Sequence, residues 1–179
     1  VHEKESAAHA SLLIRKACLA EGVQPNQLVL HSDNGSPMKG ATMLATLQKL
    51  GVVPSFSRPS VSDDNPYSES LFRTMKYTPS FPAKPFESIE AARKWVHEFV
   101  QWYNNEHHHS GIRFVTPSQR HNGEDKRILE KRKAVYEAAK ERNPKRWSGE
   151  TRDWSPVTEV WLNPPKEVRA EEQKLRKVA

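Results

Sequence analysis

The sequence contains a single cysteine, Cys18, which excludes an intrachain disulfide and any metal site built from several thiolates. No apolar run approaches the roughly 20 residues that a membrane-spanning helix needs, and the first residues lack the basic-then-apolar pattern of a secretory signal. Glycine is scarce, with 7 residues against 13 prolines, and there is no glycine-rich phosphate loop and no Ser-His-Asp or Cys-His catalytic pattern. We therefore expect a cytoplasmic protein with no membrane partner and no thiol or serine chemistry.

Positive charge is what the chain has in excess, with a formal net charge of +6 and a pI of about 9.5. From residue 120 onward there are 16 basic and 11 acidic residues, whereas the preceding part has 12 basic and 11 acidic residues. Such a balance favours a polyanionic partner. Nine cations in this second part are the best phosphate-binding candidates, although interspersed acids make a solvated helix face the alternative: Lys126, Arg127, Lys131, Arg132, Lys133, Lys140, Arg142, Lys145 and Arg146.

The spacing of apolar residues predicts an α/β fold. Two short strands flank a helix, an arrangement that implies a right-handed crossover and a parallel pair. The strands are expected at 28–31, 52–56 and 157–162. Helices are expected at 3–21, at 38–50, from Pro66 to before Pro79, from a Ser88 cap to about 105, after a Thr116-Pro117 cap, and at 124–142. Residues 166–179 should form a solvated helix or a disordered tail.

The same patterns predict which side chains are buried. The unbroken apolar run at 28–31 suggests a strand covered on both faces, and Cys18 should be a small core hydrophobe. The buried side of the 38–50 helix should contain Met38, Ala41, Leu44, Ala45 and Leu47.

Two carboxylates are placed where they could serve chemistry. Asp33 follows the first strand, at the end of a parallel sheet where ligands usually bind, and Glu69 lies near the start of a helix with 35 residues between the two. Carboxylate oxygens are the ligands that Mg²⁺ prefers, with phosphates and waters completing its shell. The alternative is a pair of solvated surface acids.

The helix that carries Glu69 also presents Arg73 and Lys76 at i+4 and i+7 on the same face. This row of an acid and two cations would suit a DNA backbone passing a metal ion, and a salt-bridged helix face is the alternative. His31 could orient Asp33; the alternative is that its ring is half-buried and only supports the structure. Asn65 could hold a loop over the metals or cap the helix.

These motifs resemble the integrase-core transposases of bacterial insertion sequences, which are relatives of retroviral integrases. The resemblance extends over about residues 1–122 and is carried by His31-Ser32-Asp33-Asn34-Gly35, Ser57-Arg58-Pro59, Asp64-Asn65-Pro66-Tyr67-Ser68-Glu69, Phe72-Arg73-Thr74-Met75-Lys76-Tyr77, Tyr103-Asn104, His109 and Thr116-Pro117. At His107 many relatives have arginine.

The resemblance implies a ribonuclease-H-like core and an Asp-Asp-Glu triad in which Asp33 is the second aspartate and Glu69 the glutamate. Both would be catalytic residues and ligands of Mg²⁺ or Mn²⁺, while Lys76, Arg73, Asn65 and Arg58 would bind DNA. The family's first aspartate precedes the helix expected at 3–21, so we expect a core that lacks its first strands, a two-metal site only once that aspartate is supplied, and an inactive isolated chain.

The function implied for the full-length parent is transposition, by metal-dependent cleavage at element ends and strand transfer into target DNA. The alternative is a non-catalytic DNA-binding or assembly module, or an inactive remnant. We expect three parts: 1–80 from the catalytic core, 81–122 as its helical continuation, and 123–179 as a basic, helical and partly disordered extension. An exposed sheet edge should also favour self-association.

Overall fold

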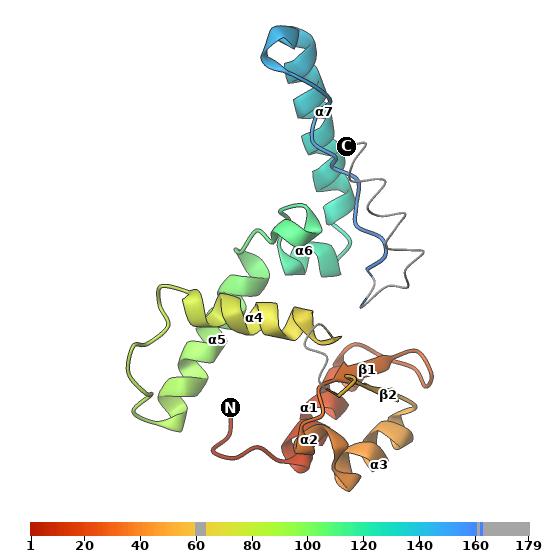
Figure 1. Cartoon of the computed structure of the whole chain (residues 1–179), viewed down its shortest axis with the longest axis vertical. Helices are drawn as coiled ribbons and strands as arrows, with labels where there is room; N and C mark the ends of the chain where they lie inside the picture. Colours follow the sequence, from red (N-terminus) through yellow and green to blue (C-terminus); the bar gives the residue numbers. More distant parts are fainter. Residues whose placement is uncertain (60–63, 161, 163–179) are drawn as a thin grey trace. The chain divides into compact units, whose positions relative to one another are not determined.

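The computed structural model in Figure 1 describes residues 1–59, 64–160 and 162. The chain divides into two compact units, Val1–Ala92 and Arg93–Ala179. Helix α5 (Ile89–Asn105) begins in the first unit and lies mostly in the second. No helix in the described ranges has the length and apolar character needed to cross a membrane.

The first unit is an α/β structure built around a parallel pair of strands. Its elements are α1 (Ala7–Ala20), β1 (Val29–Ser32), α2 (Ser36–Lys39), α3 (Ala41–Leu50), β2 (Val53–Phe56) and α4 (Pro66–Tyr77). Strands β1 and β2 pair in parallel register from Val29–Val53 to Ser32–Phe56. The predicted strand–helix–strand unit is therefore present.

The helix predicted at 38–50 is divided into α2 and α3 at Gly40. Its backbone is extended there, with φ −62° and ψ 143°. A Cβ at position 40 would lie 2.7 Å from the Cβ of Ala7, so only glycine lets this turn pack against α1. The break starts α3 at Ala41 and thereby sets the angular phase of its side chains.

The core of the first unit joins α1, α3 and the start of β2. Its buried residues are Cys18, Met43, Leu47 and Val52. Cys18 is a core residue as predicted, but Met43 replaces Leu44, which is 38 % exposed. Met43 and Leu47 lie one turn apart on the face of α3 that meets α1. Which residues lie on that face depends on where α3 begins.

The prediction that the first strand is buried on both faces is wrong for the described structure. Leu30 packs against the core cluster, but Val29, which points to the opposite face of the sheet, is 60 % exposed. Val53, its partner on β2, is 49 % exposed. The helices of this unit therefore cover one face of the strands.

The second unit is helical and its helix caps follow the sequence closely. It contains η2 (Ser110–Ile112), α6 (Pro117–His121), α7 (Asp125–Arg142) and η3 (Pro144–Arg146). The Oγ of Ser88 accepts a hydrogen bond from the amide of Ala91 at the start of α5, and Thr116 and Gln119 form a capping box on α6. Both predicted caps are present.

After η3 the chain turns back and runs along α7 (Figure 1). Trp154 from this segment is buried with Val115 and Leu129, and the carbonyl of Val157 accepts a hydrogen bond from Arg120. The strand predicted at 157–162 is absent over residues 157–160, because a side chain rather than a neighbouring strand binds this backbone. The helix or tail predicted at 166–179 lies outside the described residues.

Candidate active site

Asp33 is an exposed residue directly after β1. Its Oδ1 accepts a hydrogen bond from the backbone amide of Gly35 at 3.0 Å. A Cβ on residue 35 would lie 2.9 Å from the same oxygen. The local turn therefore fixes one carboxylate oxygen and requires a glycine beside it.

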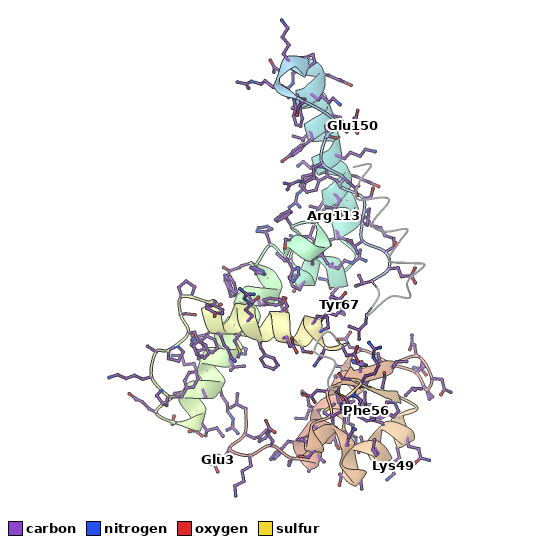
Figure 2. All side chains as sticks on the ribbon, in the orientation of Figure 1. Glu3, Lys49, Phe56, Tyr67, Arg113 and Glu150 are labelled. Atoms are coloured by element: carbon purple, nitrogen blue, oxygen red, sulfur yellow. The ribbon has the colours of Figure 1, made fainter. Side chains whose placement is uncertain are left out.

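Glu69 lies in the first turn of α4, where the helix dipole favours a negative charge. Pro66 occupies the start of the helix, where its missing amide is not needed, and Asn65 is the N-cap residue without a side-chain capping bond. Figure 2 shows Tyr67 on this first turn. Glu69 is exposed, so its carboxylate is open to a ligand.

The predicted row of charges is present on α4, because Glu69, Arg73 and Lys76 all lie within one continuous helix. Arg73 places its guanidinium 5.8 Å from the centre of the Tyr77 ring, a cation–π distance. Lys76 is exposed on the last turn.

His31, on β1, connects both strands to the start of α4. Its Nδ1 lies 2.9 Å from the Oγ of Ser55 on β2, and its Nε2 lies 2.9 Å from the backbone oxygen of Asp64. Both ring nitrogens are thus engaged away from Asp33. The hypothesis that His31 orients Asp33 is wrong, and its alternative, half-buried support, describes what the ring does.

The side chain of Asp64 is the second connection. It is buried, and it accepts hydrogen bonds from the backbone amide of Arg58 at 2.7 Å and from the Arg58 guanidinium at 3.0 and 2.9 Å. The hydrogen bonds and charge of Asp64 raise the pKa of Arg58 above its ordinary value. Arg58 therefore joins the segment after β2 to Asp64, two residues before the start of α4, while its side chain stays 65 % exposed.

A third connection joins the turn that holds Asp33 to the segment after β2. The side-chain amide of Asn34 donates to the carbonyl of Ser57 at 2.8 Å. The elements that carry Asp33 and Glu69 are thus connected through Asp64, Ser55 and Ser57. The sequence patterns assigned no such role to these three residues. The sequence does not indicate which residue an acid in a polar loop will bind, so the connecting roles of these residues could not be predicted.

The donor set suits a hard cation, with one exposed carboxylate at the end of a strand and one at the start of a helix. Mg²⁺ in proteins takes one or two carboxylates and completes its shell with waters and phosphate oxygens. Within the ranges that the structure describes, no group of three or more His, Cys, Asp or Glu side chains could hold a metal ion. Asp33 and Glu69 are therefore two candidate ligands that belong to no such group of three among these residues.

Residues 50–117 match a protein family described as "Integrase core domain". This stretch includes Glu69 and the Tyr103 to Pro117 motif, and Asp33 lies before it. A protein described as "Transposase for insertion sequence element IS904" from Lactococcus lactis subsp. lactis is 31 % identical over 103 residues, which are 57 % of this chain and 40 % of that protein.

Two further proteins are similar to this chain. An "Uncharacterized transposase-like protein" from Haemophilus influenzae is 31 % identical over 97 residues, which are 54 % of this chain and 43 % of that protein. The crystal structure of the catalytic core domain of BIV integrase aligns with a TM-score of 0.49 and 21 % identity, over 72 % of this chain and 78 % of that one.

The sequence matches confirm the resemblance that the motifs indicated, and the parallel strand–helix–strand unit agrees with the α/β class predicted from it. The matching part of the chain spans about two fifths of the length of these curated relatives.

Proposed function

We propose that this chain, whose residues 50–117 match the integrase core family, acts in DNA transposition, as part of the machinery that cuts and joins DNA at element ends. The observation that carries the proposal is the pair of exposed carboxylates, Asp33 and Glu69, on elements tied together through His31, Arg58 and Asp64.

In this proposal Asp33 and Glu69 hold Mg²⁺ or Mn²⁺. When bound, the metal supplies Lewis-acid stabilisation of charge on the phosphate that is cut. The protein's own part is to present the two carboxylates. Gly35 fixes one oxygen of Asp33 and leaves the other without a hydrogen bond among the described residues, and Glu69 is exposed on the first turn of α4.

DNA is the proposed partner, and α4 supplies its first contacts. Lys76 and Arg73 lie on the face that carries Glu69, so a strand whose phosphate reaches the metal would pass both cations. Arg58 uses its Nε and Nη2 on Asp64, so Nη1 remains for a phosphate, since a guanidinium has donors on three nitrogens. Asn65, which is half-buried at the N-cap position of α4, would contact the same DNA strand.

Nicking of supercoiled plasmid DNA in the presence of Mg²⁺ or Mn²⁺ tests this function, with a segment that carries the first aspartate of the expected triad supplied together with the chain. Loss of a residue that only supports a metal ligand typically costs roughly 10–100-fold in activity. Because Asp33 and Glu69 are proposed as direct ligands, Asp33→Asn and Glu69→Gln should each reduce nicking by more than that. Glu87→Gln removes an exposed acid of the same unit and should leave the rate unchanged. Robust cleavage that survives Asp33→Asn would contradict the site assignment.

The alternative proposal is a DNA-binding or assembly module without catalysis of its own. It is favoured by the absence of a third acid beside Asp33 and Glu69 among the described residues. DNA binding that is accompanied by no metal-dependent nicking would support the alternative. Nicking that is lost in both acid variants but retained in Glu87→Gln would exclude it.

A further inference from the structure

A hollow of about 430 Å³ lies in the second unit, on one side of α7. Three cations from α7 line it, Arg127, Lys131 and Arg132, together with the apolar side chains of Ile128, Val135 and Tyr136; two polar residues that precede α7 complete the wall. We call it the α7 groove. All of its lining residues except His108 lie beyond residues 50–117 of the integrase core match.

Two cations of the α7 groove are available and one is fixed. Arg132 donates to the carbonyls of Arg113 and Phe114 at 2.8 and 3.1 Å and places its guanidinium 5.4 Å from the Trp154 ring centre. Arg127 and Lys131 are exposed, lie one turn apart, and take part in none of the ion pairs of the described residues.

Charge around the α7 groove is of one sign. None of its described lining residues carries a carboxylate. Glu130 lies three residues after Arg127, about 60° from it around the helix, but on the side turned away from Ile128 and Val135. A phosphate in the groove would meet Arg127 and Lys131 with no carboxylate among the described lining residues.

The apolar wall decides between ligand classes. Val135 remains 55 % exposed, and Tyr136 is half-buried with its ring packed edge-on against Trp147 and Trp154. The backbone of a duplex needs no apolar wall, because its bases stay stacked on each other. A single strand presents a phosphate together with a free base, and grooves that bind it combine cations with apolar or aromatic surface.

We propose that the α7 groove binds a nucleotide of single-stranded DNA, with its phosphate on Arg127 and Lys131 and its base against Val135 and Tyr136. The proposal rests on the proposed function, which makes DNA the partner. It adds a site whose proposed phosphate and base contacts all come from α7, after the integrase core match, and specifies the form of DNA that this site takes.

The first experiment measures the affinity of the 179-residue chain for a labelled single strand of about 12 nucleotides by fluorescence anisotropy. Arg127→Ala/Lys131→Ala should weaken binding roughly 10-fold and reduce the slope of log affinity against log salt by about 1.4 in magnitude. The matched control, Arg15→Ala/Lys16→Ala, removes the same charge from exposed positions of α1 and should stay within about 2-fold. Equal losses in both double variants would overturn the proposal.

The second experiment tests the base-binding wall. The wild-type chain should bind the normal strand roughly 10-fold more tightly than an abasic strand of the same length, and Val135→Glu should remove most of that preference. Because Val135 is exposed, this variant should keep the wild-type melting temperature. Equal affinity for the two strands, or a Val135→Glu variant that binds like wild type, would overturn the assignment.

The two proposals can fail separately. If Asp33→Asn abolishes nicking while both groove variants bind the single strand as the wild type does, the groove assignment fails and the proposed function stands. If no metal-dependent nicking occurs but the groove variants lose single-strand affinity as expected, the proposed catalysis fails and the groove assignment stands.

Discussion

At the scale of single residues, the turn after β1 prepares one carboxylate for a ligand. The Gly35 amide holds Oδ1 of Asp33, and the space that a Cβ would fill at residue 35 is what lets this oxygen approach. Residue 35 has φ −58° and ψ 141°, a conformation open to any amino acid. The glycine is therefore needed for the position of Asp33 and not for the backbone.

Gly35→Ala should change metal affinity without unfolding the protein. The added Cβ lies 2.9 Å from Oδ1, so the carboxylate must turn away, and we expect affinity for Mn²⁺ to fall about 10-fold, as for loss of an orienting partner. Stability should change by less than about 1 kcal/mol. Titration calorimetry and urea denaturation measure the two effects. Gly149→Ala, where a Cβ meets nothing within 4 Å, is the control, and unchanged Mn²⁺ affinity in Gly35→Ala would contradict this role.

His107 makes stability depend on pH in a defined direction. Burial lowers its pKa below the ordinary 6.5, and the neighbouring His109 and His108 lower it further. Its ring lies 5.0 Å from the Trp102 ring and 5.3 Å from the Tyr103 ring. In the pH range between the lowered pKa and about 6.5, the unfolded chain binds more protons than the folded one, so stability falls as pH falls.

We expect the free energy of unfolding to decrease as pH is lowered from above 6.5 towards the lowered pKa of His107, and to be flat with respect to this group at higher pH. His107→Gln should flatten that part of the profile, because no proton is then taken up. His97→Gln, an exposed change on α5, should leave the slope of the wild type. Denaturant titrations across this range that give one common slope for all three proteins would contradict the assignment.

At the scale of elements, sequence reasoning predicts most helices because their signals are local. Pro66, Ser88 and the Thr116–Gln119 capping box mark the starts of α4, α5 and α6, and each depends on residues only a few positions apart. Which side chains are buried depends on distant partners instead. Gly40 shifts the phase of α3 because Ala7 lies against it, and no pattern within 38–50 contains that contact.

Contacts between distant residues also decide the structure of the segment after α7 and of the candidate site. Residues 157–160 have the composition of a strand, yet Arg120 binds the carbonyl of Val157 and Trp154 enters the core beside Leu129. For the site, the sequence indicates Asp33 and Glu69 through position and spacing. It does not reveal that Arg58 and His31 both bind Asp64, because these contacts form only when the loops fold together.

The C-terminal end of α3 supplies a stability test for one element junction. Gly51 has φ 65° in the left-handed region, and a Cβ there would lie 2.6 and 2.7 Å from two atoms of Pro25. We expect Gly51→Ala to lower the free energy of unfolding by about 1–3 kcal/mol, from backbone strain and the clash together. Urea denaturation measures the loss.

Gly123→Ala is the matched control for this junction, because Gly123 has φ +73° and nothing within 4 Å of an added Cβ. It should show the strain alone, about 1 kcal/mol. Equal losses at the two positions would mean that the contact with Pro25 contributes nothing.

At the scale of the whole molecule, charge and exposed strand surface govern what the chain associates with. The net charge of +6 favours a polyanionic partner. In the described sheet of two strands, each strand has one edge without a neighbour, and Val29 and Val53 are exposed on the face of the sheet that the helices do not cover. Unpaired edges with exposed apolar side chains promote association between copies.

We therefore predict that the isolated chain self-associates. Light scattering after size exclusion should give a mass that rises with protein concentration, and Val29→Lys/Val53→Lys should shift it towards the monomer because charges oppose edge pairing. Glu21→Lys, an exposed change at the end of α1, serves as a charge control. A clean monomer at every concentration, with one sharp melting transition, would contradict the prediction.

The most direct test of the central claim is the binding of Mn²⁺ to the 179-residue chain, measured by electron paramagnetic resonance of the free ion. We expect the wild type to bind Mn²⁺ and Asp33→Asn and Glu69→Gln each to weaken binding by more than about 10-fold, whereas Glu87→Gln should leave it unchanged. Mn²⁺ affinity that is unchanged in both acid variants would contradict the claim that Asp33 and Glu69 hold the metal.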